Sequence, residues 1–223
     1  METQKPSVLV CTLCGPERHQ WINPRLSTAL VQMSHDSRFR VTLDWIFDAH
    51  PIEYARNLCV DKARSLKSNW LLMLDNDNLP TGNPLDMIAT APPGAEILGS
   101  NYGFVVEPER RGTQSTYALI NNGAASTHGD FLEVPFGGFV GGGQLAIRAS
   151  VWEKLKAPWF KWVNGDDELL SPKNGHGEDV YFCRYAQAHG ITVWAHKRLI
   201  GHMKNVDVTA LAAQLAIQSS LAS

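Results

Sequence analysis

The sequence predicts an α/β protein: a single domain with a central, mostly parallel mixed sheet flanked by helices. Short apolar runs of strand length alternate with segments in which apolar residues recur at helical spacing, and this alternation is typical of βαβ units with a parallel sheet. A chain of 223 residues has the length of one well-packed core, whereas two domains of half that length would each be small. We therefore expect one domain over 1–223.

The first eighty residues carry the most regular pattern. Ser7–Leu13 is a β-branched apolar run that stops at a Gly-Pro pair, which predicts a buried strand leading into a loop. Helical spacing follows Asn23-Pro24. Further strands are expected at Arg40–Phe47 and Asn69–Leu74, with a helix at Ile52–Leu66 between them. Parallel strands in this arrangement place a binding site at their carboxyl ends.

From Pro80 onward the pattern is less regular, so this half is expected to be mixed rather than regularly wound. A short helix lies between Pro84 and Pro92, and a polar loop is expected over Asn164–Gly177. We expect strands at Ala95–Tyr102, Tyr117–Ile120, Gln144–Arg148 and Ile191–Trp194, helices at Ala149–Leu155 and Glu178–His189, and a helical tail over Val206–Leu221.

Composition narrows the class of protein. Charged residues make up 19% of the chain and the formal net charge is -2, which argues against a protein that wraps a polyanion. No apolar run approaches membrane-spanning length and no leader is recognisable, so a cytoplasmic protein without a membrane partner is expected. The cysteines are few, which fits a reducing compartment. Cys11 and Cys14 form a CxxC without a partner pair, so we expect small buried residues at a strand end.

Two carboxylates stand one residue apart directly after the third apolar strand, at Asp75 and Asp77. Charges held this close at a strand end repel each other unless a cation or water satisfies them. Carboxylate oxygens suit Mg²⁺ or Mn²⁺, which keep coordination positions open for substrate phosphates. A solvated turn that caps the next helix is the alternative. The pattern favours a metal site.

Two other Asp-x-Asp folds fit less well. An EF-hand loop starting at Asp75 would need a third oxygen ligand and a glycine where Leu79 and Pro80 stand. A haloacid-dehalogenase-like phosphatase places its aspartates after the first strand and uses a later Gly-Asp-x-x-x-Asp. Here Gly165-Asp166 lacks the second aspartate at that spacing, although the phosphatase stays an alternative.

Several segments occur in one order: VLVCTLCG, Ala55-Arg56-Asn57, LLMLDNDNLP, GGFVGGGQLAIRASVWEKL, GEDVYFCRYAQAHGI and IGHM. In this combination the chain, from its first strand to His202, resembles GT-A glycosyltransferases of the large family-2-like group. The resemblance implies a Rossmann-like GT-A domain, with a nucleotide-binding half over 1–80, an acceptor and catalytic half over 81–205, and a helical tail over 206–223.

The resemblance also implies roles for individual residues. Asp77 would be the direct metal ligand and His202 would complete the shell around Mn²⁺ or Mg²⁺. Such a cation neutralises the charge that builds on a departing nucleoside diphosphate. A satisfied histidine near a strand end is the alternative for His202. The residues implied to bind the donor are Thr12, Arg56, Asp75, Asn76, Gly142 and Gly143. Among them, Thr12 would meet the nucleoside, Arg56 would lie near the base or diphosphate, and the glycine backbone would approach the sugar closely.

Glu178-Asp179 follows Gly177 at the start of an expected helix. Carboxylates in a first turn are favoured by the helix dipole, so capping is the plain interpretation. In inverting members of the resembled group, an aspartate in such a motif takes the proton of the acceptor hydroxyl. We therefore expect Asp179 as general base, with Glu178 as its substitute or as an acceptor-binding residue. Trp159 and Phe160, with Trp162, form either an acceptor-binding apolar wall or part of the core.

The sequence thus predicts transfer of a sugar from a nucleoside-diphosphate sugar, with a UDP-sugar favoured, to an acceptor hydroxyl. The acceptor could be a glycan, a small molecule or a protein; a hydroxylated nucleic-acid base would need a basic groove, which the net charge disfavours. Inversion is expected. A retaining GT-A transferase, a DxD-type phosphatase and a non-catalytic nucleotide-sugar binding module stay open as alternatives, as does the choice between monomer and homodimer.

Overall fold

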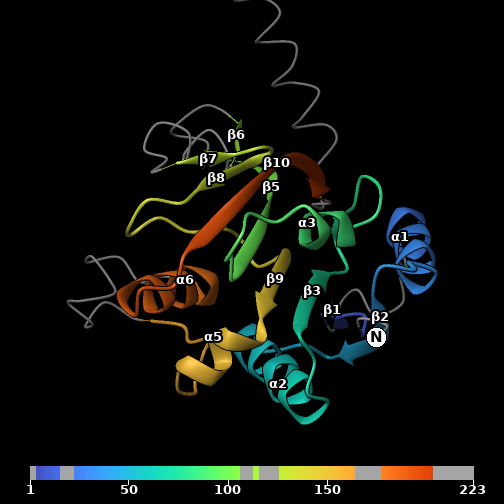
Figure 1. Cartoon of the computed structure of the whole chain (residues 1–223), viewed down its shortest axis with the longest axis horizontal. Helices are drawn as coiled ribbons and strands as arrows, with labels where there is room; N and C mark the ends of the chain where they lie inside the picture. The colour runs from blue at the N-terminus through green and yellow to red at the C-terminus, as the bar shows by residue number, and fades with distance from the viewer. Residues whose placement is uncertain (1–3, 16–22, 106–112, 116–125, 164–176, 203–223) are drawn as a thin grey trace, which may run out of the picture.

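The computed structural model describes residues 4–15, 23–105, 113–115, 126–163 and 177–202. Its described residues form one mixed sheet with strand order β2-β1-β3-β9-β5-β10-β8-β7, flanked by helices (Figure 1). β4 joins the sheet through β10, and β6 joins it through β5. The predicted fold class, an α/β domain with a mostly parallel mixed central sheet, is confirmed.

The first half is the regular part. β1 (Ser7–Cys14) lies between β2 (Arg40–Phe47) and β3 (Trp70–Asp75), and both pairings are parallel. Every residue of β1 is buried, as expected for a central parallel strand that is covered on both faces, and this burial explains its uninterrupted apolar run. The crossover helices are α1 (Pro24–Ser34) and α2 (Ile52–Ser65).

The second half mixes strand directions. β9 (Gln144–Arg148) runs antiparallel to both β3 and β5 (Ile97–Val105), whereas β10 (Val193–His202) runs parallel to β5. The strand predicted at Ile191–Trp194 corresponds to β10, which begins at Val193 and extends further, to His202. The other elements are β4 (Asn78–Leu79), α3 (Leu85–Ala89), β6 (Thr113–Ser115), β7 (Thr127–His128), β8 (Phe131–Glu133), α5 (Ala149–Lys154) and α6 (Glu178–Ala188).

Some predicted segments cannot be compared with the structure. The expected strand at Tyr117–Ile120 and the expected helical tail at Val206–Leu221 lie outside the described residues. Most of the expected loop at Asn164–Gly177 lies outside them as well.

Apolar side chains form two clusters, one on each face of the sheet. Successive strand residues point to opposite faces, so Met73 joins the cluster under α2, α5 and α6, and Leu74 joins the cluster under α1 and α3. We call these the α2 face and the α1 face. Any polar residue on a central strand can be assigned to a face by the same alternation.

The cysteines are buried and carry free thiols, as predicted for the CxxC pair. Among the described residues, no helix combines the length and apolar character needed to cross a bilayer.

Candidate functional site

The Asp-x-Asp turn lies at the carboxyl edge of the parallel strands. Asp75 ends β3, and its backbone N–H donates to the carbonyl of Gly143 at 2.9 Å. The next residue, Asn76, is buried and its N–H donates to the carbonyl of Leu13 at 3.0 Å. The turn is therefore fixed to β1 on one side and to the glycine segment before β9 on the other.

The two candidate metal ligands belong to segments that pair with each other. β4 runs antiparallel to the end of β10, so that His202 lies opposite Asn78, the neighbour of Asp77. The His202 side chain lies outside the described part of the structure. Within the described residues, no three or more His, Cys, Asp or Glu side chains are grouped to hold a metal. The Asp77 and His202 site therefore stays a prediction, supported by this backbone pairing.

Arg56 connects the motifs. Its side chain, on α2, is only 3% exposed, and its guanidinium donates to Asp75 Oδ2 at 3.0 Å and to Glu178 Oε1 at 2.9 Å. The third guanidinium nitrogen donates to the Gly142 carbonyl at 3.0 Å. Burial alone would lower the pKa of Arg56, but Asp75 and Glu178 outweigh it and raise the pKa.

This geometry changes the role expected of Arg56. The expectation was a contact with the donor base or diphosphate, but the guanidinium nitrogens are occupied by protein acceptors and the side chain is buried. Arg56 therefore holds the Asp-x-Asp turn, the glycine segment and the Glu-Asp helix start together, which is a positioning role.

The glycine pair before β9 is needed for contacts within the protein. A Cβ on Gly142 would lie 2.4 Å from Nη2 of Arg56, and a Cβ on Gly143 would lie 2.4 Å from Nδ2 of Asn78. Asn78 in turn donates to the Gly143 carbonyl at 3.1 Å. Side chains are excluded at both positions because Arg56 and Asn78 fill the space. The two glycines are therefore explained without the expected close approach of this backbone to a donor sugar.

Asp179 lies in the first turn of α6, beside the same glycine segment. Its Oδ2 accepts the N–H of Gly142 at 3.2 Å, and its Oδ1 accepts the N–H of Val180 at 2.8 Å. Burial and the neighbouring charge of Glu178 raise the pKa of Asp179 to about 6, although Arg56 and the two backbone donors oppose the shift. A carboxylate that titrates near neutral pH is suited to accept a proton.

Thr12 does not have the position expected for a nucleoside contact. It lies opposite Leu74 in the β1–β3 ladder, on the α1 face, and its side chain is fully buried. Its hydroxyl oxygen has no hydrogen-bond partner among the described residues. The strand was predicted correctly, but the prediction did not determine which face the threonine occupies.

Trp159 and Phe160 belong to the core, which was the alternative for this pair. The Phe160 ring stacks on Phe182 at 4.4 Å between centroids, and Trp159 Nε1 donates to the Leu155 carbonyl at 3.2 Å. As buried side chains they offer no surface to an acceptor, in contrast to Trp162, which is 53% exposed.

Asn57 is a positioning residue that the sequence analysis missed. Its Oδ1 accepts the backbone N–H groups of Trp159 and Phe160 at 2.9 and 3.2 Å, and its Nδ2 donates to the Phe160 carbonyl at 2.7 Å. It thereby ties the segment before Trp162 to α2. In the sequence, Asn57 is only a polar residue next to Arg56 on an expected helix. Nothing near it predicts hydrogen bonds to residues about a hundred positions later.

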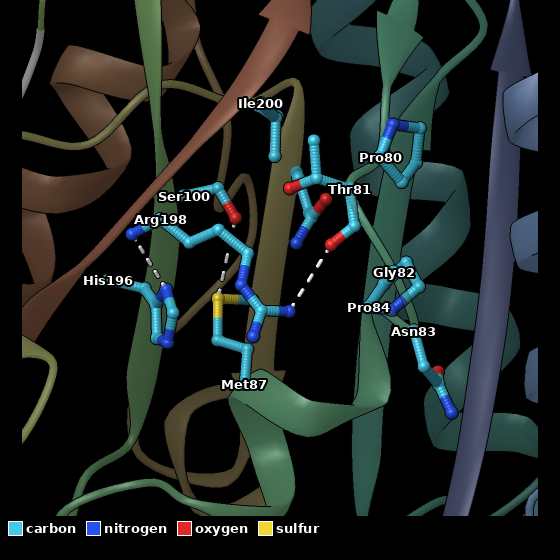
Figure 2. A pocket seen from close by; sticks show the side chains of 11 residues that line it. Pro80, Thr81, Gly82, Asn83, Pro84, Met87, Ser100, His196, Arg198 and Ile200 are labelled. Carbon is cyan, nitrogen blue, oxygen red and sulfur yellow. Dashed lines mark hydrogen bonds between the residues drawn. The ribbon is translucent and has the colours of Figure 1, made fainter.

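A second polar cluster occupies the α1 face, behind the loop that follows the Asp-x-Asp turn. Figure 2 shows Arg198 reaching the loop, where its Nη1 donates to the Thr81 carbonyl at 3.2 Å. His196 Nδ1 accepts the Arg198 N–H at 3.1 Å, and burial together with Arg198 lowers the pKa of this histidine. The lining also includes Ser100 and Gln144.

The space enclosed by this α1-face pocket is small. Its volume is about 10 Å³, close to the minimum for one water molecule. The side-chain oxygen Oε1 of Gln144 is buried without a hydrogen-bond partner among the described residues. Ser100 pairs with His196 across the β5–β10 ladder, so the polar residues that line the pocket come from segments far apart in the sequence. No local sequence pattern predicts such a cluster.

Comparison with known proteins bears on the fold. No family model matches the sequence, and no curated protein matches it. Among solved structures, the chain is similar to A197 from STIV, with 17% identity, coverage of 90% of this chain and 86% of that chain, and a TM-score of 0.52. It is also similar to a CMP:2-keto-3-deoxy-manno-octonic acid synthetase complexed with CTP, with 11% identity, coverage of 97% and 100%, and a TM-score of 0.48. At these identities the A197 likeness shows a shared fold.

Proposed function

We propose that the chain is a metal-dependent glycosyltransferase that moves a sugar from a nucleoside-diphosphate sugar to an acceptor hydroxyl with inversion. One observation carries the proposal: the buried Arg56 joins Asp75 to Glu178, beside a carboxylate, Asp179, whose pKa is raised to about 6. A strand-end aspartate, a glycine segment and a helix-start carboxylate, far apart in sequence, thus form one cluster at the carboxyl edge of the parallel strands.

The chemistry of the site fits a divalent cation. Arg56 brings one positive charge to the carboxylates of Asp75 and Glu178, so this part of the site is net negative and attracts cations. Asp77 and His202 would hold Mn²⁺ or Mg²⁺, through a carboxylate oxygen and an imidazole nitrogen. The cation would supply electrostatic stabilisation of the diphosphate leaving group.

The proposed reaction is a single in-line displacement. The acceptor oxygen attacks the anomeric carbon and forms the new glycosidic C–O bond, while its proton passes to the Asp179 carboxylate. The bond between the anomeric carbon and the phosphate oxygen breaks, and its electron pair leaves with the nucleoside diphosphate. The anomeric centre is inverted because attack comes from the side opposite the departing phosphate.

Paired substitutions test the assignment. We expect Asp77→Ala to abolish calorimetric binding of UDP in Mn²⁺, and we expect Asp179→Asn to bind UDP normally but lose transfer by about 10²-fold or more. Asp61→Asn, on the exposed side of α2, is the matched control and should preserve both properties. Transfer at the wild-type rate by Asp179→Asn would show that Asp179 is not the base and would favour Glu178 or a retaining mechanism.

A further inference from the structure

Trp162 lies next to the helix start that carries Asp179. It is 53% exposed and follows the core pair Trp159 and Phe160. A Cβ built on Gly177 would lie 3.8 Å from Cζ3 of the Trp162 indole and 3.0 Å from Oδ1 of Asp179. The exposed ring and the carboxylate therefore both lie next to the position that a Gly177 side chain would occupy.

Gly177 places no side chain between these two groups. Its backbone has φ -61° and ψ 163°, an extended conformation that any residue adopts, so the local backbone does not require glycine. An alanine would place a methyl group 3.0 Å from the Asp179 oxygen and 3.8 Å from the indole without straining the backbone.

The chemistry of an indole indicates what could rest on it. The ring face carries partial negative charge and attracts the partly positive hydrogens of C–H groups, and an aromatic ring of this size offers a large apolar surface for contact. A pyranose presents C–H groups on a face and hydroxyls around its edge. Stacked on Trp162, it would direct an edge hydroxyl sideways, across Gly177.

We propose that Trp162 is the acceptor platform, and that the acceptor is a glycan whose terminal pyranose stacks on the indole with one hydroxyl directed across Gly177 to Asp179. This inference rests on the proposed function and adds the acceptor class to it. It assigns acceptor binding to Trp162 alone, because the rings of Trp159 and Phe160 are buried.

The first test is binding of simple pyranosides. Saturation-transfer NMR is recorded with the methyl β-glycosides of glucose, galactose and N-acetylglucosamine, in the presence of UDP and Mn²⁺. Wild-type protein should saturate the ring C–H protons of at least one glycoside. Trp162→Ala should weaken that binding by about tenfold, Trp162→Phe should restore part of it, and Phe136→Ala, which removes another exposed aromatic ring, should leave it unchanged.

The second test adds a methyl group at Gly177, between the Trp162 ring and Asp179. Gly177→Ala should lower kcat/KM for the bound glycoside by about tenfold or more while UDP binding in Mn²⁺ stays at the wild-type value. If Trp162→Ala and Gly177→Ala both behave like Phe136→Ala, or no glycoside binds to wild-type protein that binds UDP with Mn²⁺, the acceptor platform is wrong. If wild-type protein fails to bind any nucleoside diphosphate with metal, the proposed function itself is wrong.

Discussion

The sheet carries a polar cluster on each face, and the two clusters are stabilised in different ways. On the α2 face, hydrogen bonds join the buried Arg56 to the buried Glu178 and to the partly buried Asp75, whose other oxygen, Oδ1, has no partner among the described residues. On the α1 face, the pocket holds neutral side chains such as Gln144, whose Oε1 has no partner in the described part of the chain, and the guanidinium of Arg198 there is about half exposed.

This difference determines how much stability each cluster loses when one of its side chains is replaced. A buried ion is tolerated only when it is paired, so removing one partner leaves the other without compensation. A neutral amide with one unsatisfied oxygen loses little when it is replaced by an apolar group of the same shape. The α2-face network should therefore respond strongly to substitution, and the α1-face pocket should respond weakly.

The largest expected effect follows removal of the central cation. Arg56→Met would leave the buried Glu178 and the partly buried Asp75 without their counter-charge, and should reduce the free energy of unfolding by about 3–5 kcal/mol in urea titrations. Arg198→Met is the matched control on the α1 face, because its guanidinium is half exposed, and should cost no more than about 1 kcal/mol. Equal losses in the two variants would contradict the contrast between the faces.

The next effect is a pH dependence centred on Asp179. Because the native pKa is about 6, above the ordinary value for aspartate, the native state retains this proton where the unfolded chain has lost it. The contribution of this group to stability therefore falls as pH rises from about 4 to 6. Asp179→Asn should be more stable than wild type by roughly 1–3 kcal/mol above pH 7, and the gap should close near pH 4.

Urea titrations at several pH values measure this gap. A gap that stays constant across the pH range would show that the Asp179 carboxyl is not the group responsible.

The smallest effect belongs to the α1-face pocket. Gln144→Met removes a buried oxygen that has no hydrogen-bond partner among the residues described, so the free energy of unfolding should change by less than about 1 kcal/mol. Urea denaturation against wild type measures it. A loss of several kcal/mol would mean that the amide is bonded as firmly as the Arg56 network, which would remove the difference between the faces.

The sequence predicted the first half of the fold well because its two inner strands, β1 and β3, are buried on both faces. β1 reads as an unbroken apolar run, and β3 ends where the paired aspartates begin. β10 was predicted too short because Lys197 and Arg198 interrupt its apolar pattern at a register shift in the ladder with β5. Burial of a whole strand leaves a clear signal, and an irregular strand with polar residues does not.

The candidate site could be predicted from the sequence less completely than the fold. Periodicity and spacing located Asp75 and the Glu178-Asp179 pair, but the space beside Gly142 is filled by Arg56, which lies 86 positions earlier in the chain. A glycine that admits a distant side chain has the same sequence appearance as a glycine that admits a ligand. Trp159 and Trp162 also look alike in sequence, and only tertiary packing buries one and exposes the other.

The most direct test of a metal-dependent nucleotide-sugar transferase is calorimetric titration of wild-type protein with UDP, GDP, CDP and dTDP, each in Mn²⁺ and again in EDTA. The proposed function predicts that one diphosphate binds in Mn²⁺ and that its binding is lost in EDTA, because a cation held by the Asp-x-Asp turn would compensate the charge of the phosphates. Absence of metal-dependent binding for all four would contradict it and would reopen the phosphatase alternative.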